Sequence, residues 1–315
     1  MKKLILAALV CALVLCSASA IAEASPESVV IKTLNGSREI TDLTVPYNPQ
    51  RLAVMDLAAL DMLDTFGLGE LVVGVSKGSS IDYLQGYVTN DDIANLGTIK
   101  DADLEAVMGC EPDLIFIGGR LSSQYDTLSE IAPVVYLGVD AQEGLVGSVR
   151  KNAETIASIF GIEDQVDEKL AGFDARIKTL AELSKGKTAL VGLCTAGSFN
   201  ILGNDGRCSI IGVEAGFENL AAVDVTSTHG NETSFELIVS LDPDYIFVMD
   251  RDAAINAEGA KLAREIMENE LVMQTDVYKN GNIVYLATPA VWYTAEGGVA
   301  ALDVMLADLE SALIK

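Results

Sequence analysis

The chain has 315 residues, half of them hydrophobic, and its formal net charge is −25 at pH 7. This length accommodates two domains of ordinary size with substantial cores, and the composition excludes collagen, coiled-coil and low-complexity architectures. The negative charge excludes nucleic acid as a partner and disfavours anionic membranes. A site for an anionic ligand must therefore be a local cluster of basic residues.

Residues 1–22 are predicted to be a secretory signal peptide. Lys2 and Lys3 precede a short apolar run, Leu4–Leu15, and Ala20 and Ala22 provide the small-x-small pattern of a cleavage position. The run is short for a helix that spans a bilayer, and no later stretch is long and apolar enough. We therefore expect an exported, periplasmic protein that is released after cleavage.

The alternative to release is lipid attachment at Cys11 or Cys16, which would anchor the protein on the outer face of the cell membrane. The residues before these cysteines, Val10 and Leu15, are larger than those favoured before a lipid-modified cysteine. Cleavage and release therefore remain the favoured prediction.

Residues 23–142 are predicted to form an N-terminal α/β lobe. Arg51–Ser76 alternates a β-rich segment, a helix with apolar residues at helical spacing, and a second β-rich segment; Gly67 ends the helix. A short helix over 103–109 and a buried strand over 114–117 follow. Another helix and strand lie over 125–138, and this β-α-β alternation predicts a mostly parallel sheet.

Residues 143–185 have helical periodicity and no strand signal, with a break expected at Gly161. We predict that this range is a long helix linking two lobes. Strand and helix patterns resume with the segment 187–194, so residues 186–315 are predicted to be a C-terminal α/β lobe. The expected fold is α/β, with two Rossmann-like lobes of mostly parallel sheet joined by one long backbone helix.

One seventeen-residue pattern occurs twice, at Leu104–Arg120 and at Phe235–Arg251. A shared packing scheme explains the apolar positions and the central Pro-Asp turn. It does not explain the Glu in second place or the Arg in last place of each copy. Each Arg directly follows a predicted strand, at the edge of an α/β sheet where ligands bind. Each Glu begins the helix before that strand, on the opposite side of the turn.

Further candidate site residues lie at junctions between strands and loops. Arg207 lies at a loop-to-helix boundary, where helix amides also favour anions. His229 is the one histidine of the chain, and Tyr293 follows a predicted strand beside Trp292. Individually these residues are more typical of surface ion pairs, loops and packing. Their placement at comparable edges of both lobes favours a common site.

Three cysteines follow residue 22, an odd number for a disulfide framework. Cys194 and Cys208 could pair in an oxidising compartment. Alternatively both could be small buried residues, as we expect for Cys110. The sequence has no CxxC motif and no zinc-ligand spacing.

From Arg51 onward the chain resembles the helical-backbone class (class III) of periplasmic substrate-binding proteins of ABC importers. The resemblance is to the branch that carries ferric catecholate siderophores of the petrobactin and enterobactin type. It is carried by four stretches in a matching order and spacing, "RLAVMDLAALDMLD", "LEAVMGCEPDLIFIGGR", "THGNETSFELIVSLDPDYIFVMDR" and "VYLATPAVWYTAEGG".

The resemblance implies roles for individual residues. Arg120, Arg207 and Arg251 match three arginines that surround the catecholate oxygens. His229 and Tyr293 match residues that coordinate the iron when the siderophore supplies only two catechols, and Trp292 beside Tyr293 is expected in the ligand site. Two exposed carboxylates of the family meet the permease dimer in the membrane, and they match Glu105 and Glu236. The resemblance implies a monomer with no intrinsic cofactor, whose ligand is the ferric siderophore.

The chemistry of these residue types agrees with that role. Ferric iron is hard and prefers anionic oxygen ligands. Two catecholates leave a complex of charge −1 with two open positions, which a phenolate and an imidazole would fill. Three catecholates give a charge of −3, which three guanidiniums would match with forked donors.

Other functions are less consistent with the sequence. Haem or a cobalamin could use the same fold, but would not need three Arg with a His and a Tyr. A protein that binds bare zinc or manganese usually collects several His and carboxylates. We expect no enzymatic activity, because the sequence lacks GxSxG, HExxH, P-loop and dinucleotide-binding motifs in a suitable context.

Overall fold

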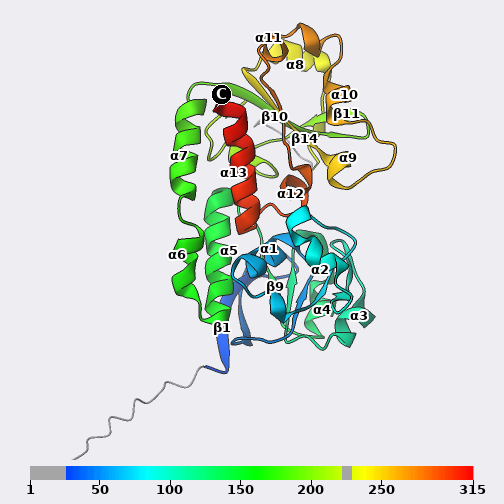
Figure 1. Cartoon of the computed structure of the whole chain (residues 1–315), viewed down its shortest axis with the longest axis vertical. Helices are drawn as coiled ribbons and strands as arrows, with labels where there is room; N and C mark the ends of the chain where they lie inside the picture. Colours follow the sequence, from blue (N-terminus) through cyan, green and yellow to red (C-terminus); the bar gives the residue numbers. More distant parts are fainter. Residues whose placement is uncertain (1–25, 222–228, 315) are drawn as a thin grey trace, which may run out of the picture.

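The computed structural model describes residues 26–221 and 229–314, so the predicted signal peptide lies outside the described residues. Two lobes, each built around a sheet, lie one above the other and are connected by helices along one side (Figure 1). Within the described ranges, no helix combines the length and apolar character needed to cross a bilayer.

The N-terminal lobe contains a five-stranded parallel sheet, as the β-α-β pattern predicts. Alternate residues of its central strands belong to separate apolar clusters, with Phe116 in one and Ile115 in the other, so both faces are covered. This accounts for the uninterrupted apolar sequence of β8. In spatial order the strands are β5 (Ala94–Asn95), β4 (Val72–Val75), β3 (Leu52–Val54), β8 (Leu114–Ile117) and β9 (Val134–Tyr136).

Short helices and two small antiparallel pairs complete this lobe. Asp56 and Asp103 begin helices by accepting hydrogen bonds from Ala59 N and Ala106 N, both at 3.0 Å. The helices are α1 (Leu57–Thr65), α2 (Gln85–Thr89), α3 (Leu104–Gly109) and α4 (Tyr125–Ser129), with 3₁₀ turns η1 (Gly69–Leu71), η2 (Asp82–Leu84) and η3 (Gly119–Gln124). The pairs are β1 (Ser28–Leu34) with β2 (Ile40–Pro46), and β6 (Gly97–Thr98) with β7 (Asp101–Ala102).

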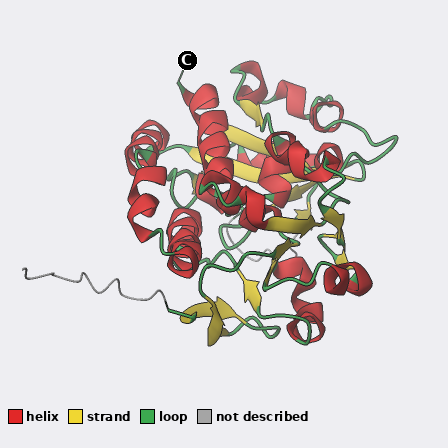
Figure 2. Ribbon diagram, turned by 60° about the horizontal axis from the view of Figure 1, so that its bottom comes forward, coloured by secondary structure: helices red, strands yellow, loops and turns green. Residues whose placement is uncertain are grey.

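The C-terminal lobe contains a mixed sheet whose central strands are parallel. Helices lie outside its strands (Figure 2), and neighbouring residues such as Phe247 and Val248 again belong to separate clusters. The spatial order is β13 (Asn231–Glu232), β11 (Ser198–Ile201), β10 (Thr188–Thr195), β14 (Tyr245–Asp250) and β15 (Ile283–Tyr285), and β12 (Glu218–Asn219) pairs with β10. Only the β10–β11 and β11–β13 pairs of this described sheet are antiparallel.

The helices of this lobe are short apart from the last one described. Ser234 begins α8 by accepting a hydrogen bond from Leu237 N at 3.2 Å. They are α8 (Phe235–Leu241), α9 (Arg251–Ala254), α10 (Ala263–Met267), α11 (Asp276–Lys279), α12 (Pro289–Thr294) and α13 (Val299–Leu313), with 3₁₀ turns η5 (Ser209–Ile211) and η6 (Val272–Gln274).

The link between the lobes is helical, as predicted, but it is not continuous. It comprises α5 (Gly144–Phe160), η4 (Glu163–Gln165), α6 (Val166–Lys169) and α7 (Phe173–Ser184). The break expected at Gly161 is present, with φ of 65°, and a second break occurs at Gly172, with φ of 90°. Both glycines adopt a left-handed conformation that ends or restarts a helix, so the single long helix is corrected to a segmented one.

Helix α13 returns to the N-terminal lobe, although its residues fall in the range assigned to the C-terminal lobe. It packs against α1 and α7 and lies beside the linking helices (Figure 1). The buried carboxylate of Asp61, in α1, accepts hydrogen bonds from Ala300 N and Ala301 N, both at 2.9 Å, and from the Tyr83 hydroxyl at 2.5 Å. The two lobes are therefore joined by α13 as well as by the link.

The repeated sequence pattern has a shared structural basis in both lobes. Asp113 accepts hydrogen bonds from Gln50 N and Arg51 N, at 2.8 and 3.0 Å, just before β3. Asp244 accepts corresponding bonds from Thr188 N and Thr188 Oγ1, at 2.8 and 3.1 Å, where β10 begins. Each aspartate thus ties the turn before its own strand to the start of the neighbouring parallel strand.

Candidate ligand-binding site

Two arginines reach the space between the lobes from equivalent strand ends. Arg120 lies in η3, directly beyond β8, and Arg251 is the first residue of α9, directly beyond β14. Both side chains are half-buried. The carboxyl ends of the parallel strands in both sheets therefore face a common site, as the repeat predicts.

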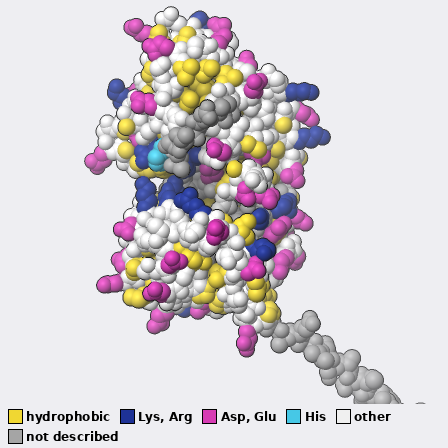
Figure 3. Space-filling model, turned by 180° about the vertical axis from the view of Figure 1, so that it is seen from behind, with side chains coloured by type: hydrophobic (Ala, Val, Ile, Leu, Met, Phe, Trp, Pro, Cys, Tyr) yellow, Lys and Arg dark blue, Asp and Glu magenta, His cyan; other side chains and the backbone are white. Residues whose placement is uncertain are grey.

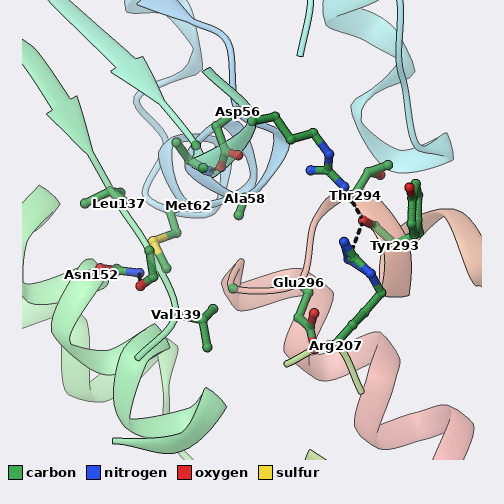
Figure 4. Close-up of a pocket in the computed structure, with 16 residues that line it drawn as sticks. Asp56, Ala58, Met62, Leu137, Val139, Asn152, Arg207, Tyr293, Thr294 and Glu296 are labelled. Atoms are coloured by element: carbon green, nitrogen blue, oxygen red, sulfur yellow. Dashed lines mark hydrogen bonds between the residues drawn. The ribbon is translucent and has the colours of Figure 1, made fainter. Parts of the chain in front are cut away.

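Tyr293, in α12, lies at the centre of three arginines. Its carbonyl oxygen accepts hydrogen bonds from Arg120 Nη2 at 2.9 Å and Arg207 Nη1 at 3.2 Å, and its hydroxyl accepts one from Arg251 Nε at 3.1 Å. Figure 4 shows the two bonds to the carbonyl. The three guanidinium carbons lie 5.3, 4.4 and 5.5 Å from the centre of the tyrosine ring, in the same order. We call Arg120, Arg207 and Arg251 the arginine cluster.

The arginine cluster is a positively charged region in a protein whose formal net charge is −25. Figure 3 shows Lys and Arg side chains gathered in the hollow at the waist, whereas Asp and Glu side chains are spread over the rest of that face. Arg207 Nε is buried and makes no hydrogen bond within the described part of the chain. The cluster is thus suited to an anionic ligand that offers several oxygens.

His229 lies beside the same tyrosine, with ring centres 6.3 Å apart and the rings inclined at 29°. Partial burial lowers the pKa of this imidazole, and nearby positive charges lower it further. The imidazole is therefore neutral at neutral pH and able to coordinate a metal ion. The charges belong to Arg251, Arg207, Lys100 and Arg120.

The phenol of Tyr293 is also shifted toward its metal-binding form. Burial alone would raise the pKa of Tyr293, but the hydrogen bond from Arg251 and the charges of the arginine cluster outweigh burial and lower it. The arginines thus reduce the free energy of forming a phenolate. Tyr293 and His229 together offer one anionic oxygen and one nitrogen at the same place.

Carboxylates behind the arginine cluster were not predicted from the sequence. Asp252 is 6% exposed and accepts from Arg251 Nη1 at 3.3 Å, Thr195 Oγ1 at 2.9 Å and Ala196 N at 2.7 Å. Arg251 also donates to Thr195 Oγ1 at 2.9 Å. This network fixes the guanidinium of Arg251, and the position of Asp252 directly after Arg251 was its only sequence signal.

Arg207 and Arg120 also face carboxyl groups. Glu296 accepts a hydrogen bond from Cys208 N at 3.0 Å; burial raises the pKa of Glu296 to about 7, against the opposing charge of Arg207. Burial likewise raises the pKa of Asp56, against the charge of Arg120. Asp252 is therefore in direct contact with Arg251, whereas Glu296 and Asp56 interact with Arg207 and Arg120 through charge.

Trp292 is not brought to the site, and its predicted contact with the ligand is corrected. Its side chain is fully buried, and its Nε1 donates to Asp308 Oδ2 at 2.8 Å. Adjacent residues of a helix point about 100° apart. Tyr293 therefore faces the arginine cluster while Trp292 faces α13.

The remaining candidate residues lie elsewhere. Glu105 and Glu236 are exposed second residues of α3 and α8, and these helices lie at the outer ends of the lobes, away from the waist (Figure 1).

Cys194 and Cys208 are free and belong to different apolar clusters, so the possible disulfide is not formed. The described residues include no group of three or more His, Cys, Asp or Glu placed to hold a metal ion.

Two α/β lobes whose strand ends face a shared charged site define the architecture of a two-lobed ligand-binding protein. Residues 52–290 match the family model described as periplasmic binding protein, and the chain belongs to that family.

Several relatives resemble the chain along most of its length. The petrobactin-binding protein YclQ of Bacillus subtilis is 36% identical over 278 residues, 86% of this chain and 84% of the relative. Its crystal structure matches with a TM-score of 0.84 at 33% identity, covering 92% of this chain and all 100% of that one. The periplasmic catecholate-siderophore binding protein VctP of Vibrio cholerae has a TM-score of 0.81 at 32% identity, covering 90% and 100%. The ferric-anguibactin-binding protein FatB of Vibrio anguillarum is 27% identical over 274 residues, 84% and 83% of the two chains.

Proposed function

We propose that this protein captures a ferric catecholate siderophore between its lobes and delivers it to an ABC permease dimer for iron uptake. The observation that carries the proposal is the convergence of three arginines from both lobes on Tyr293. The names of the relatives, which describe binding of petrobactin, catecholate siderophores and ferric anguibactin, support it. We further propose that the protein is exported and released as a monomer, or is lipid-anchored if a leader cysteine is modified.

The charges of the site support an anionic ferric complex. Catecholate oxygens lie in adjacent pairs around the iron, and a guanidinium presents paired donors to such oxygens. The buried Arg207 Nε is one donor available for this purpose. Three arginines match the charge of a tris-catecholate.

His229 and Tyr293 extend the proposal to ligands with fewer catechols. A ferric bis-catecholate has two open coordination positions, for which a neutral imidazole and a phenolate are suitable ligands. The lowered pKa of each group favours these forms. The two residues thus complete the coordination of an incomplete complex, while the arginine cluster holds the catecholate oxygens.

The test is titration of the purified protein with a panel of ferric complexes, followed through the fluorescence of Trp292. The buried indole adjoins Tyr293, so a ferric catecholate bound there quenches it by energy transfer into the visible charge-transfer band. Ferric catecholates should quench strongly, whereas ferric hydroxamates, which are not polyanionic, should bind much more weakly. Tighter binding of a hydroxamate, haem or a cobalamin would overturn the proposal.

A further inference from the structure

A second cavity adjoins the arginine cluster on the side of the N-terminal hairpin. It has a volume of about 550 Å³ and lies between β1, β2, the end of β9 and α5; we call it the hairpin cavity. Its size is within the range of small-molecule sites, roughly 300–1,000 Å³. It shares wall residues with the cavity of about 130 Å³ beside the arginine cluster, so the two cavities are neighbours. The shared residues are Gly119, Leu137, Gly138, Val139 and Asn152.

The hairpin cavity is lined by more basic than acidic side chains, in a chain of net charge −25. Lys32 is paired with Asp42 at 2.8 Å. Lys151 lies 3.8 Å from Glu143, a long ion pair, and Arg38 donates to the carbonyl oxygen of Gly119 at 3.3 Å. Arg38 and Lys151 are therefore the cations most available to a ligand.

Asp140 is the acidic residue of the lining, and it does not neutralise Arg38 or Lys151 through an ion pair. Its carboxylate accepts a hydrogen bond from Gln142 N at 2.9 Å. No ion pair joins it to Arg38 or Lys151 within the described residues. The apolar part of the lining is formed by Leu34, Ile40, Leu137 and Val139.

Tyr136 lines the hairpin cavity beside Gly119, which lines both cavities. The tyrosine is 4% exposed. Burial raises the pKa of this phenol; the charge of Arg38 acts against that shift and the charge of Asp56 adds to it. The hydroxyl therefore keeps its proton and remains a hydrogen-bond donor. A Cβ atom at Gly119 would lie 3.1 Å from its hydroxyl oxygen. Tyr136 therefore offers a hydroxyl donor at the wall of the hairpin cavity, next to a position that only glycine leaves open.

We propose that the hairpin cavity binds the part of the ligand that carries no iron, and that it selects a carboxylate on that part. The inference rests on the proposed siderophore function. With the ferric catecholate at the arginine cluster, the linker of the ligand passes Gly119 and lies against the apolar lining. Arg38 and Lys151 bind the carboxylate, and the Tyr136 hydroxyl donates to it.

The test combines a matched pair of ligands with matched protein variants. One ligand is a ferric bis-catecholate with a free carboxylate on its linker; the other carries a neutral amide there. Wild-type protein should bind the carboxylate form about tenfold more tightly, the order of one charge-assisted contact. Arg38→Gln and Lys151→Gln should abolish most of that preference. Arg150→Gln is the control, because Arg150 neighbours Lys151 but pairs with Asp167 at 2.8 Å.

A third ligand, ferric tris-catechol without any linker, separates this inference from the function on which it rests. Its affinity should be unchanged in Arg38→Gln and Lys151→Gln. An equal loss for this complex, or a wild-type protein that does not distinguish carboxylate from amide, would overturn the role of the hairpin cavity alone. Failure of all three ferric complexes to bind would overturn the proposed function as well.

Discussion

Tyr293 engages the arginine cluster through three different groups, its carbonyl, its hydroxyl and its ring. Tyr293→Phe therefore removes the hydroxyl and leaves the other two contacts in place. We predict that Tyr293→Phe and His229→Ala weaken a ferric bis-catecholate more than a ferric tris-catecholate, because only the former has open positions on iron. Titrations should show the difference, and the visible charge-transfer band should shift. If both variants lose the same affinity for the two complexes and the spectra do not change, His229 and Tyr293 line the site without coordinating the iron.

Arg120 offers the cleanest test of charge matching. Its guanidinium donates to the Tyr293 carbonyl and has no ion pair within the described residues. We predict that Arg120→Gln weakens binding of the ferric siderophore by about 1.5–3 kcal/mol, the range for a charge-assisted hydrogen bond. The free energy of unfolding without ligand should change by less than about 0.5 kcal/mol. A large fall in stability, measured by urea denaturation beside Arg150→Gln as control, would instead indicate a structural role.

The effect of the arginines on Tyr293 can be measured without iron. A guanidinium favours the phenolate, so Arg251→Gln should raise the pKa of Tyr293. Phenolate absorbance during alkaline titration should show a first step in the wild-type protein that Tyr293→Phe removes and Arg251→Gln moves to higher pH. This step should precede those of Tyr83 and of the buried Tyr136, whose pKa values are raised. An unmoved first step would contradict the electrostatic argument.

At the scale of elements, the contact between α1 and α13 is pH-sensitive. Burial raises the pKa of Asp61 from 3.8 to about 6. The pKa of Asp61 is higher in the folded state than in the unfolded state. The contribution of Asp61 to the free energy of unfolding is therefore fully present below about pH 4 and is lost as the pH rises through about 6. Relative to Asp61→Asn, the wild-type protein should lose on the order of 3 kcal/mol between those limits, at 1.36 kcal/mol per unit. Chemical denaturation across that pH range is the measurement, and a constant difference would contradict it.

The buried strands, the break at Gly161 and the positions of Arg120 and Arg251 follow from local sequence. Apolar periodicity locates β8 and its neighbours, and a residue placed directly after a parallel strand must lie at the ligand edge of the sheet. The Gly161 break is equally local, since glycine tolerates the left-handed conformation. These features needed no knowledge of contacts between distant segments.

The features that could not be predicted from the sequence depend on contacts between segments far apart in the chain. Asp61 and Ala300 are 239 residues apart, and nothing local to either indicates that they meet. Glu296 and Asp56 are two of 46 acidic residues, and only the fold places them behind arginines. Trp292 and Tyr293 are adjacent, and their sequence does not say which of them faces the ligand.

At the scale of the whole molecule, Glu105 and Glu236 occupy the same helix position at opposite ends of the protein. We predict that alanine at either position leaves siderophore affinity unchanged and impairs uptake, and that the double variant is worse. An exposed ion pair is worth at most about 1 kcal/mol, whereas a docking pair that excludes water can contribute more. The assay is uptake of radioactive iron in cells with the cognate permease.

A control variant and a binding measurement show whether a loss of uptake is due to lost docking. Glu154→Ala removes an exposed carboxylate from α5 and should leave transport unaffected. Ligand titration of the purified variants should give wild-type affinities. Transport at the wild-type rate by the double variant would remove the docking role, and the repeated pattern would then reflect only its common turn and strand packing.

The return of α13 to α1 also sets an order on the folding of the chain. The inner face of α1 is apolar, and α13 packs directly against it. The amino-terminal half therefore cannot finish burying its hydrophobic surface until a segment some 239 residues further along has been synthesised. Closing so long a loop is entropically costly and slows folding. If the protein is exported, as proposed, and crosses the membrane in the unfolded state, this delay keeps the chain unfolded until its last helix has been made.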